Sequence, residues 1–354
     1  MTSMSSSSPA TTPRSTSASG TLGALAVLAV AIVVPLWFES EYLYNAILAP
    51  TLALGLAALG LNLLTGYAGQ PSLASAGFMA IGAFAAYNLN LRVPGLPMVA
   101  SLIIAGIIAA GLGLIFCLPG LRLKGFYLAV STLAVQFFVE WATNNYKWLS
   151  NYSQSGVVDA PPLQAFGYVA QTPSAKYFVA LTVVAILTFL VARLVRTQTG
   201  LNFIAIRDNE VAAKVIGVPV MRTKLIAFAI STFIIGIAGV LWAFTYLGMI
   251  QAGYGGFGLG RSFSVMFSII IGGLATIRGA YLGAAFMVAF PLLLSRWFDF
   301  LTDGVDAGVL ENWQKITIGT LIIIILIFEP DGLSALLDRV TRWFKRLVSG
   351  GKEA

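Results

Sequence analysis

The 354-residue sequence contains no histidine and a single cysteine, Cys117. An intrachain disulfide is therefore impossible, and zinc or haem sites built from several histidine or cysteine ligands are excluded, so no metal site is predicted. Cys117 is interpreted as a small apolar residue within a helix. The sequence also lacks a GxxxxGK[ST] phosphate-binding loop, so any nucleotide chemistry must be supplied by another protein.

Charged residues are scarce as well. They make up 10% of the chain, whereas a soluble protein of this length carries about 25%. Apolar residues account for 58%, and the mean hydropathy is +0.87. These values predict an all-α, polytopic transmembrane helical bundle. The net charge of +7 comes from bases near the ends of apolar segments, as cytoplasmic loops require, and nucleic-acid binding is not predicted.

Apolar segmentation predicts about 8–10 transmembrane helices, some of them broken. Two segments, 262–277 and 315–328, fall short of the usual length and are interpreted as tilted, re-entrant or extended by a few residues. The ten candidate spans are 21–38, 42–64, 72–91, 97–118, 125–141, 177–196, 224–247, 262–277, 279–296 and 315–328.

The two ends of the chain are predicted to be cytoplasmic tails. Residues 1–20 are rich in Ser and Thr and predict a disordered tail, and residues 334–354 form a basic tail. The transmembrane domain then covers residues 21–333. Its first span is expected to be retained, because Leu36-Trp37-Phe38-Glu39 offers no small residues for a signal-peptide cleavage site. Basic residues between 193 and 224 place that segment in the cytoplasm too.

Residues 42–91 contain no Asp, Glu, Lys or Arg, yet Gly66–Pro71 interrupts them with a polar, helix-breaking sequence. Irregular backbone at membrane depth survives only inside protein or beside a watery cavity, and transporters place their pathways at such breaks. The predicted translocation-path residues are Asn62, Thr65, Gly66, Gly69, Gln70, Ser72 and Ser75. The alternative is that these residues only satisfy the broken backbone and allow helices to pack closely.

The cytoplasmic segment 200–217 carries the second candidate site. As one helix it would place Val211, Ala212, Val215 and Ile216 on one side and Arg207, Glu210 and Lys214 on the other. Such a helix can lie in a groove of a partner protein. The alternative is a connecting helix that rests at the membrane surface.

Several stretches resemble a known family. Glu210-Val-Ala-Ala-Lys-Val-Ile-Gly217 is similar to the coupling segment of ABC-importer permeases, although its Glu is displaced by one residue and no Ile-x-Leu-Pro follows. Those departures point to the LivM-type branched-chain amino acid permease family, which the chain resembles from about residue 43 to 333. The other matching stretches are 60–73, 124–129, 272–279 and 329–332.

The resemblance implies one half of a translocation path for amino acids in a bacterial inner membrane, surrounded by membrane lipid. The implied partners are a LivH-type second permease, two P-loop ATPase subunits that bind the ATP, and a periplasmic substrate-binding protein; the chain itself needs no cofactor. Within the coupling segment, about 197–223, the ATPase-coupling residues would be Arg207, Glu210, Ala212, Ala213, Lys214 and Gly217. Substrates of the family include branched-chain amino acids, other amino acids and amides such as urea.

A neutral path suits a zwitterionic substrate that meets no deep fixed charge. A helix starting near Pro71 would direct the positive end of its dipole at the substrate carboxylate. The Gly272–Gly279 segment is interpreted as a second tight turn or as an ordinary glycine C-cap.

Two other function classes were weighed. An enzyme is not predicted, because the chain has no His and its acids Glu140 and Glu329 lie at span ends. A sodium-coupled secondary transporter of a small neutral or zwitterionic solute remains the alternative, since such a carrier can bind its ion through backbone carbonyls.

Overall fold

A computed structural model describes residues 41–93, 95–120, 126–165, 168–170, 172–251, 256–301, 307–328, 332–337 and 339. The predicted tail 1–20, the predicted first span 21–38 and most of the tail 334–354 lie outside these residues. The same holds for parts of two motif stretches, residues 124–125 and 329–331.

Helices dominate the described part of the chain, as the composition predicts. Two of them, α2 and α9, adjoin the three described π-helical segments, labelled η. In chain order the helical elements are η1 (Leu43–Leu48), α2 (Ala49–Asn62), η2 (Leu63–Tyr67), α3 (Ser75–Arg92), α4 (Met98–Gly120), α5 (Phe126–Asn145), α6 (Pro173–Leu194), α7 (Gln198–Asp208), α8 (Glu210–Val215), α9 (Val220–Leu241), η3 (Trp242–Leu247), α10 (Leu259–Gly272), α11 (Ile277–Leu301) and α12 (Ala307–Phe328).

Five described helical stretches are long and apolar enough to cross a membrane by length and composition alone. The two short segments are now explained. The last one is longer than predicted, because α12 begins at Ala307 rather than at residue 315. By contrast, α10 has only 14 residues and ends where Gly273 adopts φ +114°, so it is too short to cross a bilayer by itself. The five stretches are Leu43–Tyr67, Met98–Phe116, Pro173–Leu194, Val220–Leu247 and Ile277–Trp297.

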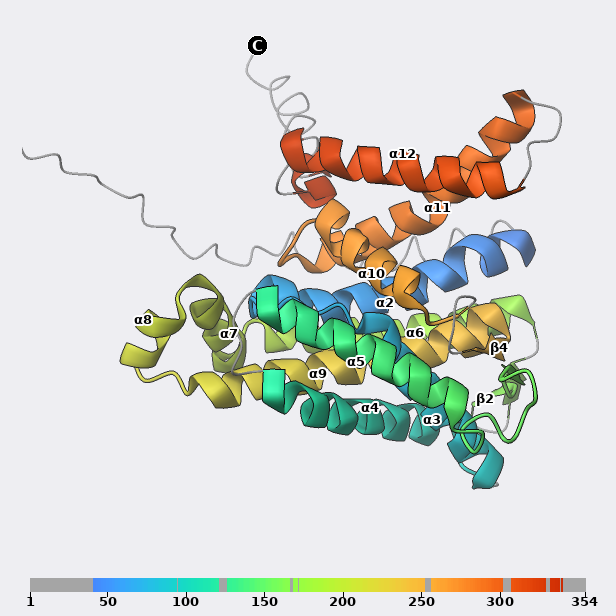
Figure 1. The fold of residues 1–354 in the computed structure, drawn as a ribbon, viewed down its shortest axis with the longest axis horizontal. Helices are drawn as coiled ribbons and strands as arrows, with labels where there is room; N and C mark the ends of the chain where they lie inside the picture. The colour runs from blue at the N-terminus through green and yellow to red at the C-terminus, as the bar shows by residue number, and fades with distance from the viewer. Residues whose placement is uncertain are drawn as a thin grey trace, which may run out of the picture. The chain divides into compact units, whose positions relative to one another are not determined.

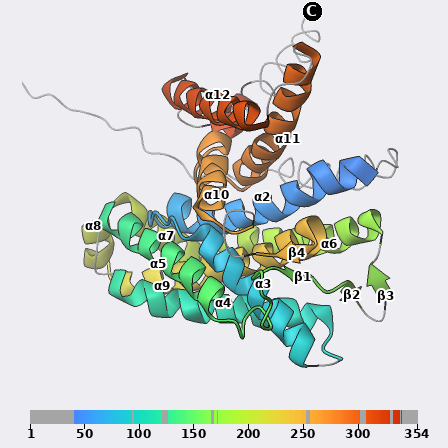
Figure 2. The same cartoon turned by 45° about the vertical axis from the view of Figure 1, so that its right-hand side comes forward.

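Two short antiparallel strand pairs lie at one end of the helices. Strand β1 (Val158–Asp159) pairs with β4 (Met249–Ile250), and β2 (Leu163–Ala165) pairs with β3 (Tyr168–Ala170). Figures 1 and 2 show β2 and β4 at the end opposite to α7 and α8. The segment between α5 and α6 therefore holds three of the strands, and the segment predicted to be cytoplasmic lies at the other end.

Glycines let the helices approach until their backbones touch. A Cβ on Gly82 of α3 would lie 2.7 Å from Gly236 Cα of α9, and a Cβ on Gly239 would clash with the backbone of Met79. Helices α10 and α11 meet in the same way, since a Cβ on Gly283 would collide with the carbonyl of Ser268. Such small-residue contacts are typical of helix pairs in membranes, where close backbone approach replaces a hydrophobic driving force.

Candidate coupling and translocation site

The predicted interruption at Gly66–Pro71 is present. The π-helical segment η2 ends at Tyr67, Gly69 adopts the left-handed conformation with φ +66°, and the next helix begins only at Ser75. The prediction that this helix starts near Pro71 is therefore wrong by about one turn. The π-helical turn and the left-handed glycine together end the helix that begins with α2. Both features often mark functional sites.

The first amides of α3 are satisfied by side chains from other helices. The Ala76 amide donates to Ser262 Oγ at 2.9 Å, and the Gly77 amide donates to Gln136 Oε1 at 2.6 Å. These donors are therefore unavailable to a substrate carboxylate, contrary to the expectation from the helix dipole. The four amide–acceptor pairs at this helix start are Leu73–Thr132, Ala74–Ser72, Ala76–Ser262 and Gly77–Gln136.

Gln136 is a central residue that the sequence reasoning missed. It is fully buried, and its Oε1 accepts from Ser262 Oγ as well as from the Gly77 amide. Its Nε2 donates to the Phe257 carbonyl at 3.0 Å. One side chain of α5 thus joins the starts of α3 and α10. The available signal was a lone amide in the middle of an apolar helix, where an unsatisfied polar group is costly.

Asn62 is also fully buried and clips two distant segments together. Its Nδ2 donates to the Thr276 carbonyl, and its Oδ1 accepts from the Ala275 amide, both at 2.8 Å. The bonded turn lies between α10 and α11, where Ala275 has φ +56°. Gly273 ends α10 as a glycine C-cap, which is one of the two interpretations given for this segment. The turn that follows is also hydrogen-bonded to Asn62, at the end of α2 before the interruption.

The other predicted path residues divide into two groups. Thr65 Oγ1 donates to the Gln70 carbonyl at 3.2 Å, and Ser72 Oγ accepts from the Ala74 amide. Both side chains therefore satisfy polar groups of the interrupted backbone. Both polar atoms of the Gln70 side chain and Ser75 Oγ are buried without a hydrogen-bond partner among the described residues. Gln70 and Ser75 therefore retain free hydrogen-bonding capacity beside the interruption.

The coupling segment forms two helices instead of one. Helix α7 ends at Asp208, and Asn209 leaves the helical conformation with φ −159°. The Asn209 Oδ1 then accepts from the amides of Val211 and Ala212 at 3.0 Å each. The prediction of a continuous helix over 200–217 is wrong because Asn209 acts as the N-cap of α8, a role that asparagine fills well.

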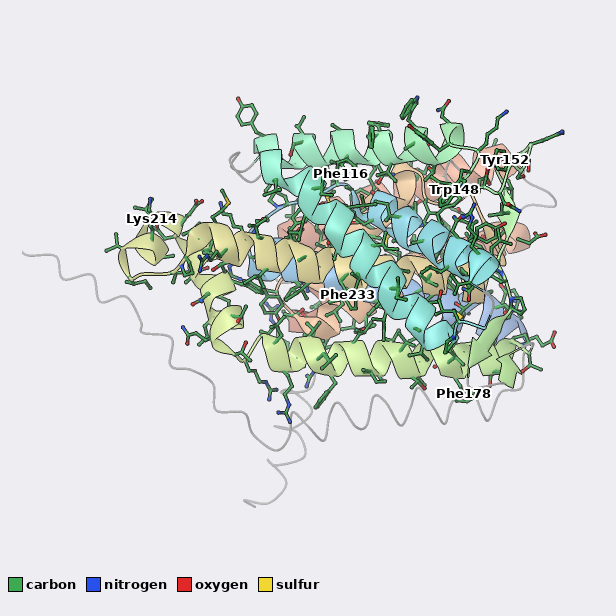
Figure 3. All side chains as sticks on the ribbon, turned by 90° about the horizontal axis from the view of Figure 1, so that it is seen from below. Phe116, Trp148, Tyr152, Phe178, Lys214 and Phe233 are labelled. Atoms are coloured by element: carbon green, nitrogen blue, oxygen red, sulfur yellow. The ribbon has the colours of Figure 1, made fainter. Side chains whose placement is uncertain are left out.

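Helix α8 presents a largely exposed apolar face. Val211, Val215 and Ile216 are 68%, 82% and 75% exposed, whereas Ala213 is buried. Ala212, Lys214 and Gly217 are exposed too, and Gly217 ends the segment with φ +88°. Figure 3 shows Lys214 at the end of the molecule away from Trp148 and Tyr152.

Helix α8 is anchored by an ion pair. Lys224 Nζ at the start of α9 lies 3.0 Å from Glu210 Oε2, and the two side chains are 10% and 33% exposed. Partial burial weakens solvent screening, so this pair constrains α8 more than a surface pair would. Glu210 thus serves first to hold α8 against α9.

Arg207 joins the two predicted sites. Its Nη1 donates to the Gly66 carbonyl at 3.1 Å, across 141 residues of sequence. The same side chain fills the space beside Gly69, where a Cβ would lie 2.9 Å from Arg207 Cγ. A second contact, 2.8 Å to Asp208, is a surface pair and contributes little. Arg207 therefore connects α7 directly to the backbone of the interruption.

Comparison with known proteins gives a consistent result. Residues 43–326 match the family described as branched-chain amino acid transport system, permease component. The chain is 29% identical over 298 residues to the high-affinity branched-chain amino acid transport system permease protein LivM of Salmonella typhimurium, covering 78% of this chain and 66% of the relative. It is 26% identical to a probable LivM permease of Methanocaldococcus jannaschii, covering 84% and 91%.

More distant similarity extends to other importers. An autoinducer 2 import system permease protein, LsrC, of an Enterobacter species is 35% identical over 124 residues, or 32% of this chain and 36% of the relative. No solved structure matches. The match spans about two thirds of the length of the enterobacterial LivM relatives.

Proposed function

Because the chain belongs to the branched-chain amino acid transport permease family, we propose that it is a membrane permease subunit of an ATP-binding-cassette importer. It forms half of the translocation path, and a LivH-type second permease forms the other half. Two ATPase subunits bind and hydrolyse the ATP, a periplasmic protein delivers the substrate, and the assembly resides in a bacterial inner membrane. Branched-chain amino acids are the proposed substrates.

One observation carries the mechanism, namely the hydrogen bond from Arg207 to the Gly66 carbonyl. It connects an exposed helix pair at one end of the molecule to the interruption between α2 and α3. A movement imposed on α7 and α8 displaces this carbonyl and the left-handed turn at Gly69. The ATPase stroke thereby reaches the part of the chain that lies beside the free polar groups of Gln70 and Ser75.

The exposed face of α8 supports an ATPase subunit as the partner. Val211, Val215 and Ile216 are more than two thirds exposed at a charged, solvent-facing end of the molecule. Apolar side chains at such a surface are characteristic of a helix that inserts into a groove of another protein. Lys214, exposed on the same helix, is placed for charge contacts at the rim.

The first test is affinity purification of the tagged protein in mild detergent, with mass spectrometry of the proteins that accompany it. A second permease and two P-loop ATPases in near-equal amounts are expected. A protein that purifies alone, and whose uptake depends on a sodium gradient, would instead be an ion-coupled carrier, and the importer proposal would be wrong.

The coupling role of Arg207 is tested by Arg207→Ala in the reconstituted assembly. We expect ATP hydrolysis to continue while uptake per ATP falls about tenfold, because the charged hydrogen bond to Gly66 is lost. Arg196→Ala is the matched control, since Arg196 is exposed just before α7. Equal uptake per ATP in the two variants would remove Arg207 from the transmission route.

A further inference from the structure

Helix α10 starts at the level of the middle of α5 rather than at a membrane surface. The Phe257 carbonyl, just before α10, accepts from Gln136 Nε2, and Ser262 in the first turn donates to Gln136 Oε1. Gln136 lies halfway along α5, which runs from Phe126 to Asn145. Figure 1 shows α10 starting between the two ends of the molecule. The first turn of α10 therefore lies beside the middle of α5, within the span predicted at 125–141, rather than beside either end of that helix.

This turn carries a cation without an acidic partner. Arg261 makes no ion pair with any described residue, and its Nε is buried without a hydrogen-bond partner. Its guanidinium lies 4.1 Å from the centre of the Trp242 ring, and Tyr246 packs edge-on against that ring at 4.7 Å. Aromatic faces stabilise a cation but do not replace a counter-ion. Ionisable residues at membrane depth are expensive, and they commonly mark substrate or ion pathways.

The surroundings of Arg261 favour an anion. Gly258 is the N-cap of α10 and provides no capping side chain, and a Cβ on Gly260 would meet nothing within 4 Å. Open space therefore lies beside Gly260 in the first turn, near the positive end of the helix dipole, whereas the Arg261 amide itself donates to the Gly258 carbonyl at 2.9 Å. The Nε1 of Trp242, in a side chain only 1% exposed, is a second buried donor without a hydrogen-bond partner in the described part of the chain.

We propose that Arg261, beside the open side of the first turn of α10, receives the carboxylate of the amino acid as it crosses the membrane. The inference rests on the proposed importer function and adds a specific position in the path. Trp242 holds the guanidinium in place, and the arriving carboxylate supplies the missing counter-charge. Under this proposal the path contains a fixed charge at Arg261, in contrast to the neutral path expected from the residues of the Gly66–Pro71 interruption.

The proposal is tested with the assembled importer in proteoliposomes, using L-leucine as the probe. Arg261→Gln is expected to lower leucine uptake at least about tenfold, while co-purification of the partner subunits and ATP hydrolysis stay at the level of the unmodified protein. Arg261→Lys keeps the charge and should recover a substantial part of the uptake. Arg196→Gln, which removes an exposed charge outside the transmembrane region, is the control and should transport normally.

The outcomes separate this proposal from the function on which it rests. Normal leucine uptake by Arg261→Gln in an intact assembly would refute the carboxylate site and leave the importer function standing. Loss of the second permease from the purified Arg261→Gln assembly would show that Arg261 pairs with an acid of that partner, which also overturns the proposal. If the unmodified protein recruits no ATPase, the importer function itself fails.

Discussion

The Asn62 clip gives the sharpest prediction about how the interruption is held. Replacing Asn62 with Leu keeps the branched shape and the number of side-chain heavy atoms, with a somewhat larger volume, but removes both hydrogen bonds to the turn after α10. The amide of Ala275 and the carbonyl of Thr276 then lose their 2.8 Å partners at a fully buried position. The turn is already strained by the positive φ of Ala275, so it is expected to change conformation once the two hydrogen bonds to Asn62 are lost.

The expected magnitude follows from these two bonds. Interhelical hydrogen bonds in membranes contribute about 0.6 kcal/mol on average and about 1.7 kcal/mol at most. Leaving a buried backbone group unsatisfied costs about 1–3 kcal/mol. Two such bonds amount to about 1–3 kcal/mol, and two unsatisfied groups to about 2–6 kcal/mol. Asn62→Leu should therefore lower the free energy of unfolding by about 2–4 kcal/mol, the middle of these ranges. Leucine uptake should fall as well, since the broken helix is no longer joined to α10 and α11.

The measurement is thermal unfolding in detergent, followed by tryptophan fluorescence. Thr51→Val is a matched control in the same helix, because Thr51 Oγ1 is buried and has no hydrogen-bond partner among the described residues. Removing that hydroxyl should leave the unfolding temperature unchanged or raise it slightly. If Asn62→Leu and Thr51→Val unfold at the same temperature, the clip does not stabilise the protein and the reasoning is refuted.

Two further predictions concern packing and anchoring. Gly82→Val should prevent stable insertion, because the new side chain would clash with the Gly236 backbone. Gly111→Ala is the control and should accumulate normally, because a Cβ there meets nothing within 4 Å. Equal levels of the two variants on membrane immunoblots would contradict this prediction. Lys224→Gln should reduce uptake per ATP several-fold, because it frees α8 from α9. Adding Glu210→Gln should restore part of the uptake, because the double variant removes both charges of this partly buried contact. A double variant no better than the single one in a transport assay would argue against this role.

The sequence was sufficient to locate the interruption and the coupling segment, because both depend on local chemistry. Gly, Gln and Pro within an uncharged run indicate by themselves that a continuous helix cannot form there. The split at Asn209 was also readable, since Asn followed by Glu is a helix-start pattern that the apolar periodicity obscured. The start of α12 was missed because Glu311 and Gln314 interrupt the apolar run without interrupting the helix.

The partners of these segments were beyond local reasoning. Gln136 lies 59 residues from the amide that it caps, and Asn62 lies 213 residues from Ala275. Such pairings depend on how the helices are arranged in space, and no periodicity within one helix specifies them. Arg261, which makes no ion pair within the described ranges, was overlooked for a related reason. Its position becomes evident only once α10 is seen to begin beside Gln136, in the middle of α5.

The glycine contacts described for the fold constrain how the molecule can change shape. Where Gly82 meets Gly236 and where Gly272 meets Gly279, backbone lies against backbone, with no flexible side chain between them to absorb sliding. Helices α3 and α9 must then travel together, as must α10 and α11. The contact of α2 with α11 is softer, since Gly55 faces the ring of Tyr281 rather than backbone. If the proposed path opens and closes, we therefore expect the α3–α9 pair to rotate as a unit relative to the α10–α11 pair, with α2 between them.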